Sequence, residues 1–188
     1  QGPYEVLETT WLPYERVRYM KVFEDVFERT YNSGKFTCLL SYVSRIYARD
    51  YFALYEGLTN EWLALGYDEQ ALSDEGLCQF LWHCCQDRLD LTEEQQAVAA
   101  DLLALDMQVC FQFRYHAGFL GWQEAPREET DAMFRDEEWL RQYVPDYVFT
   151  SWRDVKMRCR VWPVGRDTLD ELRACINNAA KRAQEYFA

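Results

Sequence analysis

Histidine and cysteine side chains gather in the segment Trp82-His83-Cys84-Cys85, with Cys78 shortly before it. These residue types could bind zinc, which takes imidazole and thiolate ligands. The segment reads as helical, and on a helix Cys78 and Cys85 lie about 10 Å apart along the axis. Two thiolates that share one zinc ion must lie within about 4 Å of each other. His83 falls on the opposite helix face and no CxxC pair exists, so we predict packed thiols and no metal ligands.

A single carboxylate, Asp106, lies on the apolar stripe of a long predicted helix, beside Leu102 and Val109. An unpaired charge on a buried face is costly, so this carboxylate must find a partner or shift its pKa. The main interpretation is an ion pair or a cap for a neighbouring helix terminus. The alternative is a group that lines a cleft.

His116, near the end of the same helix, is the other candidate for chemistry. It could act as a general base, but no Ser or Cys nucleophile motif accompanies it, which favours a surface or capping role. A stand-alone enzyme that uses Asp106 and His116 would need both groups in one deep pocket. The sequence lacks GxGxxG, GxxxxGKS/T, HExxH, GxSxG and CxxxCxxC. We therefore assign no catalytic, cofactor-binding or metal-binding residue, and keep Asp106 and His116 as catalytic candidates only.

Charge and composition exclude several classes of partner. The 188 residues carry 20 Lys+Arg against 32 Asp+Glu, a net charge of −12. This excess argues against binding nucleic acid or an anionic membrane surface, both of which attract cationic side chains. No apolar run of about 18 residues and no signal peptide is present. The seven cysteines show no repeating spacing and are typical of buried free thiols, so we expect a cytoplasmic protein.

Aromatic residues make up 16% of the chain, which admits two interpretations. They could fill the core of a helical domain. They could also form a contact surface for another domain, because Trp and Tyr are favoured in interfaces.

Hydrophobic periodicity predicts a mainly helical chain. Apolar residues recur at spacings of three and four, and Thr92 with Gln95 forms a capping box at the start of the longest helix. Residues 118–135 read as a long loop. The predicted helices cover residues 14–31, 36–48, 51–65, 92–113, 136–143 and 168–186. One more predicted helix begins at Ser73.

The period changes near the C-terminal end. From Val155 to Trp162 apolar and polar residues alternate, which predicts a half-buried strand with Val155, Met157, Cys159 and Val161 inward. A lone strand is unstable, so a partner is needed, either 147–152 or 111–115. We therefore expect a mainly α fold, a single helical domain of about six to seven helices with a small β element near the C-terminal end. Residues 1–12 would be a linker and 13–188 one accessory domain.

Several segments resemble a known family. Residues 3–12, PYEVLETTWL, come first, and a helix then ends in Tyr31-Asn32-Ser33-Gly34-Lys35-Phe36. This pattern resembles the C-terminal domain of unknown function of cobalamin-binding-type radical SAM proteins. Two later parts are also similar to this family. They are residues 101–106, and residues 143–145 together with residues 156–161 further along the chain. The sequence departs from the family pattern at 107–109.

The resemblance implies a larger parent protein with an N-terminal cobalamin-binding domain and a central radical SAM barrel. That barrel would hold a [4Fe–4S] cluster and cleave S-adenosylmethionine, and none of those ligands is in this chain. The start at Gln1-Gly2, without Met, fits a piece of a longer protein. We expect a non-catalytic accessory domain that packs on the barrel and helps to shape its substrate site. The alternatives are the stand-alone enzyme above and an interaction module that docks a separate protein through aromatic residues.

Overall fold

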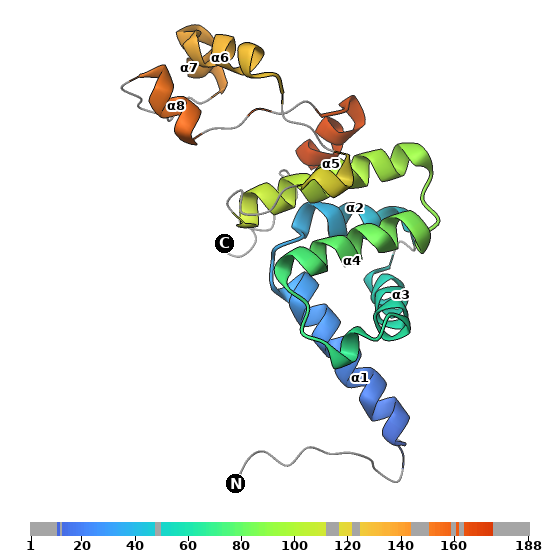
Figure 1. Cartoon of the computed structure of the whole chain (residues 1–188). Helices are drawn as coiled ribbons and strands as arrows, with labels where there is room; N and C mark the ends of the chain where they lie inside the picture. The colour runs from blue at the N-terminus through green and yellow to red at the C-terminus, as the bar shows by residue number, and fades with distance from the viewer. Residues whose placement is uncertain are drawn as a thin grey trace, which may run out of the picture.

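The computed structural model describes residues 11, 13–47, 50–111, 117–121, 125–143, 151–158, 161 and 164–174, and every regular element among them is helical. Figure 1 shows the arrangement. The main body holds α1 (Tyr14–Phe27), a π-helical turn (Glu28–Asn32), α2 (Thr37–Tyr47), α3 (Tyr51–Ala64), α4 (Asp74–Asp87) and α5 (Glu93–Phe111). Two short 3₁₀ turns (Tyr67–Glu69 and Ala117–Leu120) accompany them.

Side-chain caps fix where these helices begin. Ser73 Oγ accepts the Gly76 N–H at 3.1 Å at the start of α4. Thr92 Oγ1 accepts the Gln95 N–H at 3.3 Å, while Gln95 Oε1 accepts the Thr92 N–H at 3.0 Å. This reciprocal pair satisfies two amide groups that the helix itself leaves unbonded. The predicted capping box of α5 is therefore confirmed.

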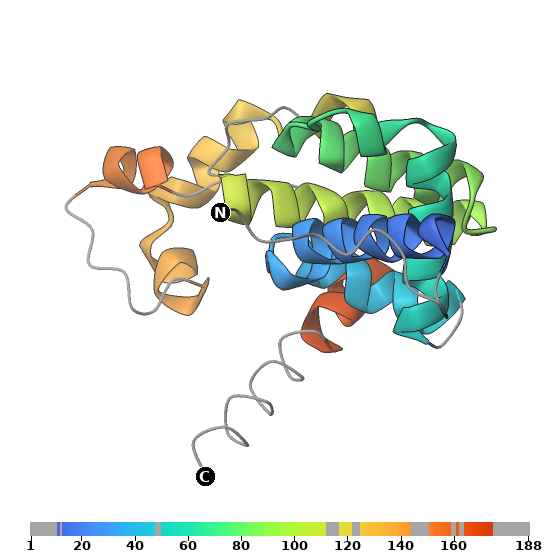
Figure 2. The ribbon, with the colours of Figure 1, turned by 90° about the horizontal axis from the view of Figure 1, so that it is seen from below.

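The main core forms where α5 lies between α2 and α4, while α1 packs against α3 (Figure 2). Leu102 and Leu103 of α5 are both fully buried, so two sides of this helix contribute to the core. On the α3–α4 side, the Trp62 and Phe80 rings meet edge to face with centroids 5.0 Å apart. Burial of each such side chain contributes about 1.5–3 kcal/mol to folding.

A second, smaller apolar cluster lies in α6 (Arg127–Arg135), α7 (Glu137–Tyr143) and α8 (Trp152–Arg158). Its centre is Phe134, Leu140 and Val155, one residue from each helix. Figure 1 shows these three helices set apart from the main body. Residues 166–174 return to the main body as a helical segment, where Thr168 Oγ1 donates to Asp101 Oδ2 of α5 at 2.8 Å.

The predicted strand over 155–162 is wrong, because Val155 to Arg158 belong to α8. Val155 is fully buried while Met157 is 80% exposed. In a strand these two side chains would share one face, whereas on a helix they point about 200° apart. Lys156 Nζ also pairs with Asp131 Oδ1 of α6 at 2.6 Å. No β-strand occurs in the described part of the chain, so the small β element is not supported.

A helix was also missed, since α6 lies within the predicted loop. Its start signals are Pro126 at the N-cap and the acids Glu128 and Glu129 in the first turn, where the helix dipole favours them. The proposed strand partners 112–115 and 147–150, the helix beyond residue 174 and most of the linker 1–12 lie outside the described residues. Among the helices that the structure describes, none is long and apolar enough to cross a membrane.

Candidate functional site

Asp106 of α5 caps the N-terminus of α2. Its Oδ2 accepts the Leu39 N–H at 2.9 Å, and its Oδ1 accepts the Cys38 N–H at 3.2 Å. The residue is only 5% exposed. The capping interpretation of this carboxylate is confirmed. Both oxygens face the backbone of a neighbouring helix, so the side chain holds α2 against α5.

Burial raises the pKa of Asp106 to about 6, although the two backbone N–H bonds and the Cys38 thiol act in the opposite direction. Removal of the carboxylate from water favours its neutral form, and here that effect exceeds the stabilisation of the charge by its donors. The group is therefore poised to change protonation near neutral pH. Both carboxylate oxygens nevertheless accept hydrogen bonds from backbone amides of α2, so the side chain holds the junction between α2 and α5.

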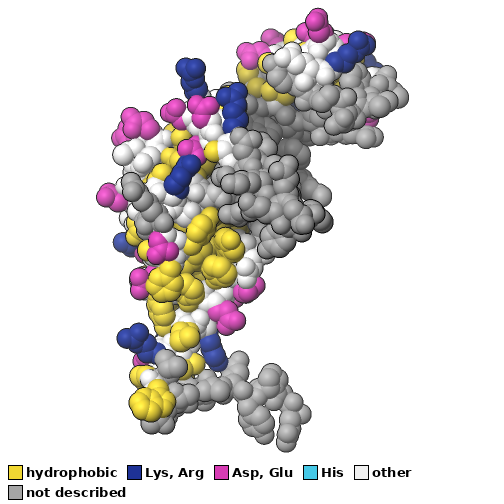
Figure 3. Space-filling view, turned by 180° about the vertical axis from the view of Figure 1, so that it is seen from behind, with side chains coloured by type: hydrophobic (Ala, Val, Ile, Leu, Met, Phe, Trp, Pro, Cys, Tyr) yellow, Lys and Arg dark blue, Asp and Glu magenta, His cyan; other side chains and the backbone are white. Residues whose placement is uncertain are grey.

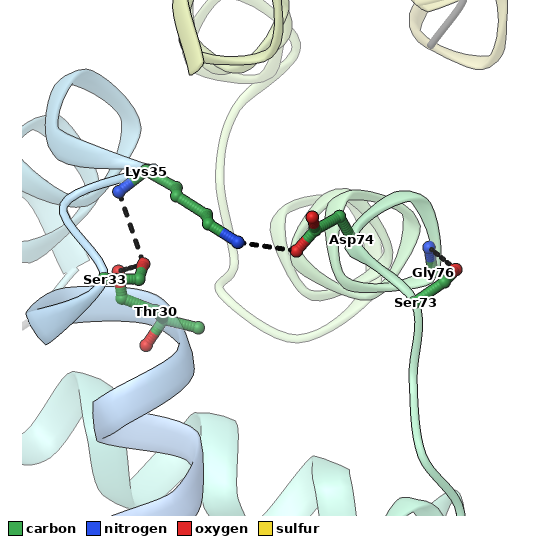
Figure 4. Close-up of polar contacts among 6 residues, drawn as sticks. All are labelled: Thr30, Ser33, Lys35, Ser73, Asp74 and Gly76. Carbon is green, nitrogen blue, oxygen red and sulfur yellow. Dashed lines mark hydrogen bonds and ion pairs between the residues drawn. The ribbon is translucent and has the colours of Figure 1, made fainter. Parts of the chain in front are cut away.

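The segment before α2 forms a tight connection (Figure 4). The π-helical turn ends at Asn32, and Gly34 takes a positive φ of 67°, a conformation that glycine adopts without strain. Ser33 Oγ donates to the Thr30 carbonyl at 3.0 Å and accepts the Lys35 N–H at 3.3 Å. Lys35 then reaches Asp74 Oδ1 at the start of α4, at 2.7 Å. The connection thereby ties α1, α2 and α4 together.

Two separate segments that carry the family resemblance thus meet in space. The Tyr31–Phe36 segment leads directly into the amide groups that Asp106 caps, and Phe36 is fully buried beside Phe111 at a centroid distance of 6.2 Å. The role of these residues is to fix a helix junction. His116 lies outside the described residues, so its pairing with Asp106 stays a prediction.

A second cluster of charges joins α3 to α4. Glu61 of α3 is 6% exposed, and its Oε1 lies 2.9 Å from His83 Nε2. Its Oε2 lies 2.7 Å from Arg88 Nε. The second ring nitrogen of His83 lies 3.0 Å from Asp87 Oδ2. Burial acts to raise the pKa of Glu61, but the His83 and Arg88 bonds outweigh it and lower that pKa.

Beside this cluster lies a hollow of about 380 Å³. Its apolar walls come from Leu58, Cys84 and Leu89, which are all buried. Arg88 and Asn60 supply polar groups at the same hollow. Its size falls within the range of small-molecule sites.

Sequence reasoning did not select Glu61 or Arg88, although a signal for both was present. Glu61 falls on the apolar stripe of α3, seven residues after Leu54, and Arg88 falls on the stripe of α4, eleven residues after Leu77. Charged residues on two apolar stripes indicate a pair that meets across the helix contact, the same logic that selected Asp106.

The thiols of α4 are packed, as predicted. Cys78, Cys84 and Cys85 are buried, and burial raises the pKa of Cys78 and of Cys85 to about 12. Within the described ranges, no group of three or more His, Cys, Asp or Glu side chains could hold a metal ion.

Aromatic rings also form a partly exposed surface on α1, the π-helical turn and α3. We define the aromatic face as Phe23, Phe27, Tyr31, Tyr51 and Phe52. The rings form two groups, with centroid distances of 5.6 Å for Phe23–Phe52, and of 5.0 Å for Phe27–Tyr31 and 5.6 Å for Tyr31–Tyr51. The buried Tyr55 ring joins the groups, 6.2 Å from Phe23 and 4.8 Å from Phe27. Phe52 is 64% exposed and Tyr31 41%. Figure 3 shows hydrophobic side chains gathered on the side turned away from the viewer in Figure 1, in the region of α1 and α3.

Comparison with protein families places the chain. The DUF4080 family, described as a protein of unknown function, matches residues 1–180. The chain belongs to this family. The DUF4080 match includes all the described helices, the Asp106 cap, the charge cluster around Glu61 and the aromatic face. Neither the curated proteins nor the solved structures gave a match.

Proposed function

We propose that this DUF4080 chain is a non-catalytic accessory domain that packs against a neighbouring domain through its aromatic face. The observation that carries the proposal is the exposure of this face. Interfaces between domains are enriched in Tyr, Phe and Met, and large contiguous apolar patches on a protein surface mark interaction sites. Here Phe52 and Tyr31 are exposed, and Met20, one turn before Phe23 on α1, is 57% exposed.

The positions of the apolar side chains around α1 explain why part of the aromatic face remains accessible. Val22 and Val26 point into the core, while Phe23 and Phe27 lie further round the helix and are only half-buried. The apolar arc of α1 is thus wider than the core can cover. Beneath the face, the Tyr55 hydroxyl accepts a hydrogen bond from Thr30 Oγ1 at 3.1 Å, which fixes its ring as a rigid base. A preformed surface of this kind loses little entropy when it docks.

The proposed neighbour precedes α1 in the same polypeptide. Trp11 is 90% exposed and Tyr14 is 50% exposed, so large exposed rings also occur where the chain enters α1. A domain joined at this end would be held close to the aromatic face, which raises its effective concentration. The resemblance implies that this neighbour is a radical SAM barrel with a cobalamin-binding domain. The [4Fe–4S] cluster, S-adenosylmethionine and cobalamin would belong to those parts, and this domain would help to shape the substrate site.

The engagement of the buried acids supports this proposal over a stand-alone enzyme. Asp106 accepts two backbone amides, and Glu61 is paired with His83 and Arg88. Each carboxylate already has a complete structural role. A catalytic acid or base would instead need an oxygen directed at a substrate.

The double substitution Phe52→Ser and Tyr31→Ser tests the docking role. In the full-length polypeptide we expect it to separate thermal unfolding into two transitions, because the domains no longer stabilise each other. In the isolated 188-residue chain it should shift the unfolding temperature only slightly, since both residues are exposed. Met157→Ser, at another exposed site, is the control. Equal effects of the double substitution in the two proteins would refute docking through this face.

The same experiment distinguishes a separate partner from a domain of the same polypeptide. If the full-length protein shows no coupling between domains but a second protein binds the native chain and not the double variant, the interaction-module interpretation replaces the intramolecular one. The coding sequence directly before Gln1 provides an independent check. The proposal predicts that it encodes a CxxxCxxC motif, and its absence would remove the radical SAM context.

A further inference from the structure

We propose that the hollow between α3 and α4 is a binding site for a small carboxylate with a compact apolar body. This inference is independent of the docking proposal, because it concerns different residues. It rests on three observations in the described structure: an anchored arginine, two accessible polar side chains beside it, and apolar residues in the lining.

Arg88 is held in place by its Nε atom. That nitrogen lies 2.7 Å from Oε2 of Glu61, whose side chain is only 8% exposed, while the Arg88 side chain is 55% exposed. The buried carboxylate therefore anchors Arg88, whose side chain stays partly exposed at the hollow. Arg88 makes no hydrogen bond or ion pair with any other described residue. Glu61 acts as a positioning residue, and its carboxylate forms an ion pair with Arg88.

Further polar groups converge on the same hollow. Tyr47 and Asn60 line it, and neither side chain has a hydrogen-bond partner within the described residues. The Tyr47 hydroxyl lies over Gly57, 3.6 Å from the position that a Cβ would take there. A hydroxyl, an amide and a guanidinium are together a set of donors that suits an anion.

The shape of the site favours a carboxylate over other anions. The two terminal nitrogens of arginine present a planar fork that matches a carboxylate. Leu58, Cys84 and Leu89 form apolar walls, and the volume of about 380 Å³ accepts a body the size of a small aromatic or branched aliphatic group. A ligand such as benzoate would bury its ring on these walls and place its carboxylate at Arg88.

Titration of the ¹⁵N-labelled 188-residue chain with benzoate, followed by NMR, tests the site. We expect saturable shifts of the Asn60, Ala64 and Leu89 amide signals, and no matching shifts with benzamide, which has the same ring without the charge. Inorganic phosphate, which lacks the apolar body, should bind more weakly. Equal shifts with benzamide, or saturation with phosphate alone, would overturn the proposal.

Two variants act on the site in different ways. Arg88→Gln should weaken benzoate binding about tenfold or more, because a charge-assisted pair is lost. Arg141→Gln, which removes an exposed arginine of α7, should leave binding unchanged. Ala64→Leu keeps every charge and fills the hollow from an exposed position, so it should also block benzoate. If Arg88→Gln is unfolded, Ala64→Leu decides the question, and undiminished binding by a folded Ala64→Leu chain contradicts the proposed location.

Discussion

Asp106 shows how a single buried charge can set the stability of this domain. Its pKa is raised from 3.8 to about 6, so the folded state binds a proton more tightly than the unfolded state. The stabilising contribution of this group is therefore complete below about pH 4. It is lost as the pH rises through about 6. The cost of keeping this group charged at neutral pH is on the order of 2–3 kcal/mol. The raised pKa already includes the opposing effect of the two capping bonds to α2.

The substitution Asp106→Asn should remove this pH dependence. We expect the difference in unfolding free energy, wild type minus variant, to fall between about pH 4 and pH 6 and to stay level above about pH 7. Urea denaturation across this range measures it. Asp25→Asn, which removes an exposed carboxylate paired with Arg29, controls for the loss of one negative charge. A flat difference curve for Asp106→Asn would show that its protonation does not change on folding.

Individual residues also show what the sequence could predict of the candidate site. Asp106 was identified because a carboxylate on an apolar stripe needs a partner, and the structure supplies α2 as that partner. Glu61 and Arg88 followed the same rule but were not selected. Which two charged residues meet depends on how α3 and α4 pack, and helical periodicity alone does not specify that packing. For the aromatic residues, composition indicated both core packing and a contact surface, but it did not show which rings stay exposed.

At the scale of elements, helices with clear caps and periodicity were predicted, whereas the short helices α6 and α8 were not. The Thr92–Gln95 box marks the start of α5 in both sequence and structure. α8 is a helix of only seven residues. Over so short a segment, alternating apolar and polar residues fit a half-buried strand and a short helix about equally. Contacts with Phe134 and Leu140 decide the outcome, because a helix buries Val155 between them.

Substitutions in α8 test this correction. Val155→Asp places an unpaired charge in the small core of α6, α7 and α8, so we expect it to unfold these helices, with a loss of about 3 kcal/mol or more. Met157→Asp should change stability by less than about 0.5 kcal/mol, because the side chain is 80% exposed. Hydrogen exchange in residues 127–158 measures both effects. Equal damage from the two substitutions would instead fit the alternating strand.

At the scale of the whole molecule, the chain combines a well-packed helical body with one face that its own core leaves uncovered. The charge of −12 is distributed over helix faces, caps and ion pairs, several of which are seen here. Aromatic residues occur both in the core and at the surface. Trp62 and Phe80 fill the core, while Phe52 and Tyr31 are exposed.

The most direct test of the docking proposal compares oxidation of two methionines by hydroxyl radicals. Met20 adjoins the aromatic face and is 57% exposed, whereas Met157 lies on α8 and is 80% exposed. In the isolated chain both should be oxidised readily. In the full-length polypeptide we predict that oxidation of Met20 and Phe52 falls about threefold or more, while that of Met157 is unchanged, because a docked domain excludes water from the centre of its interface. Unchanged oxidation of Met20 and Phe52 in the full-length protein would contradict the account.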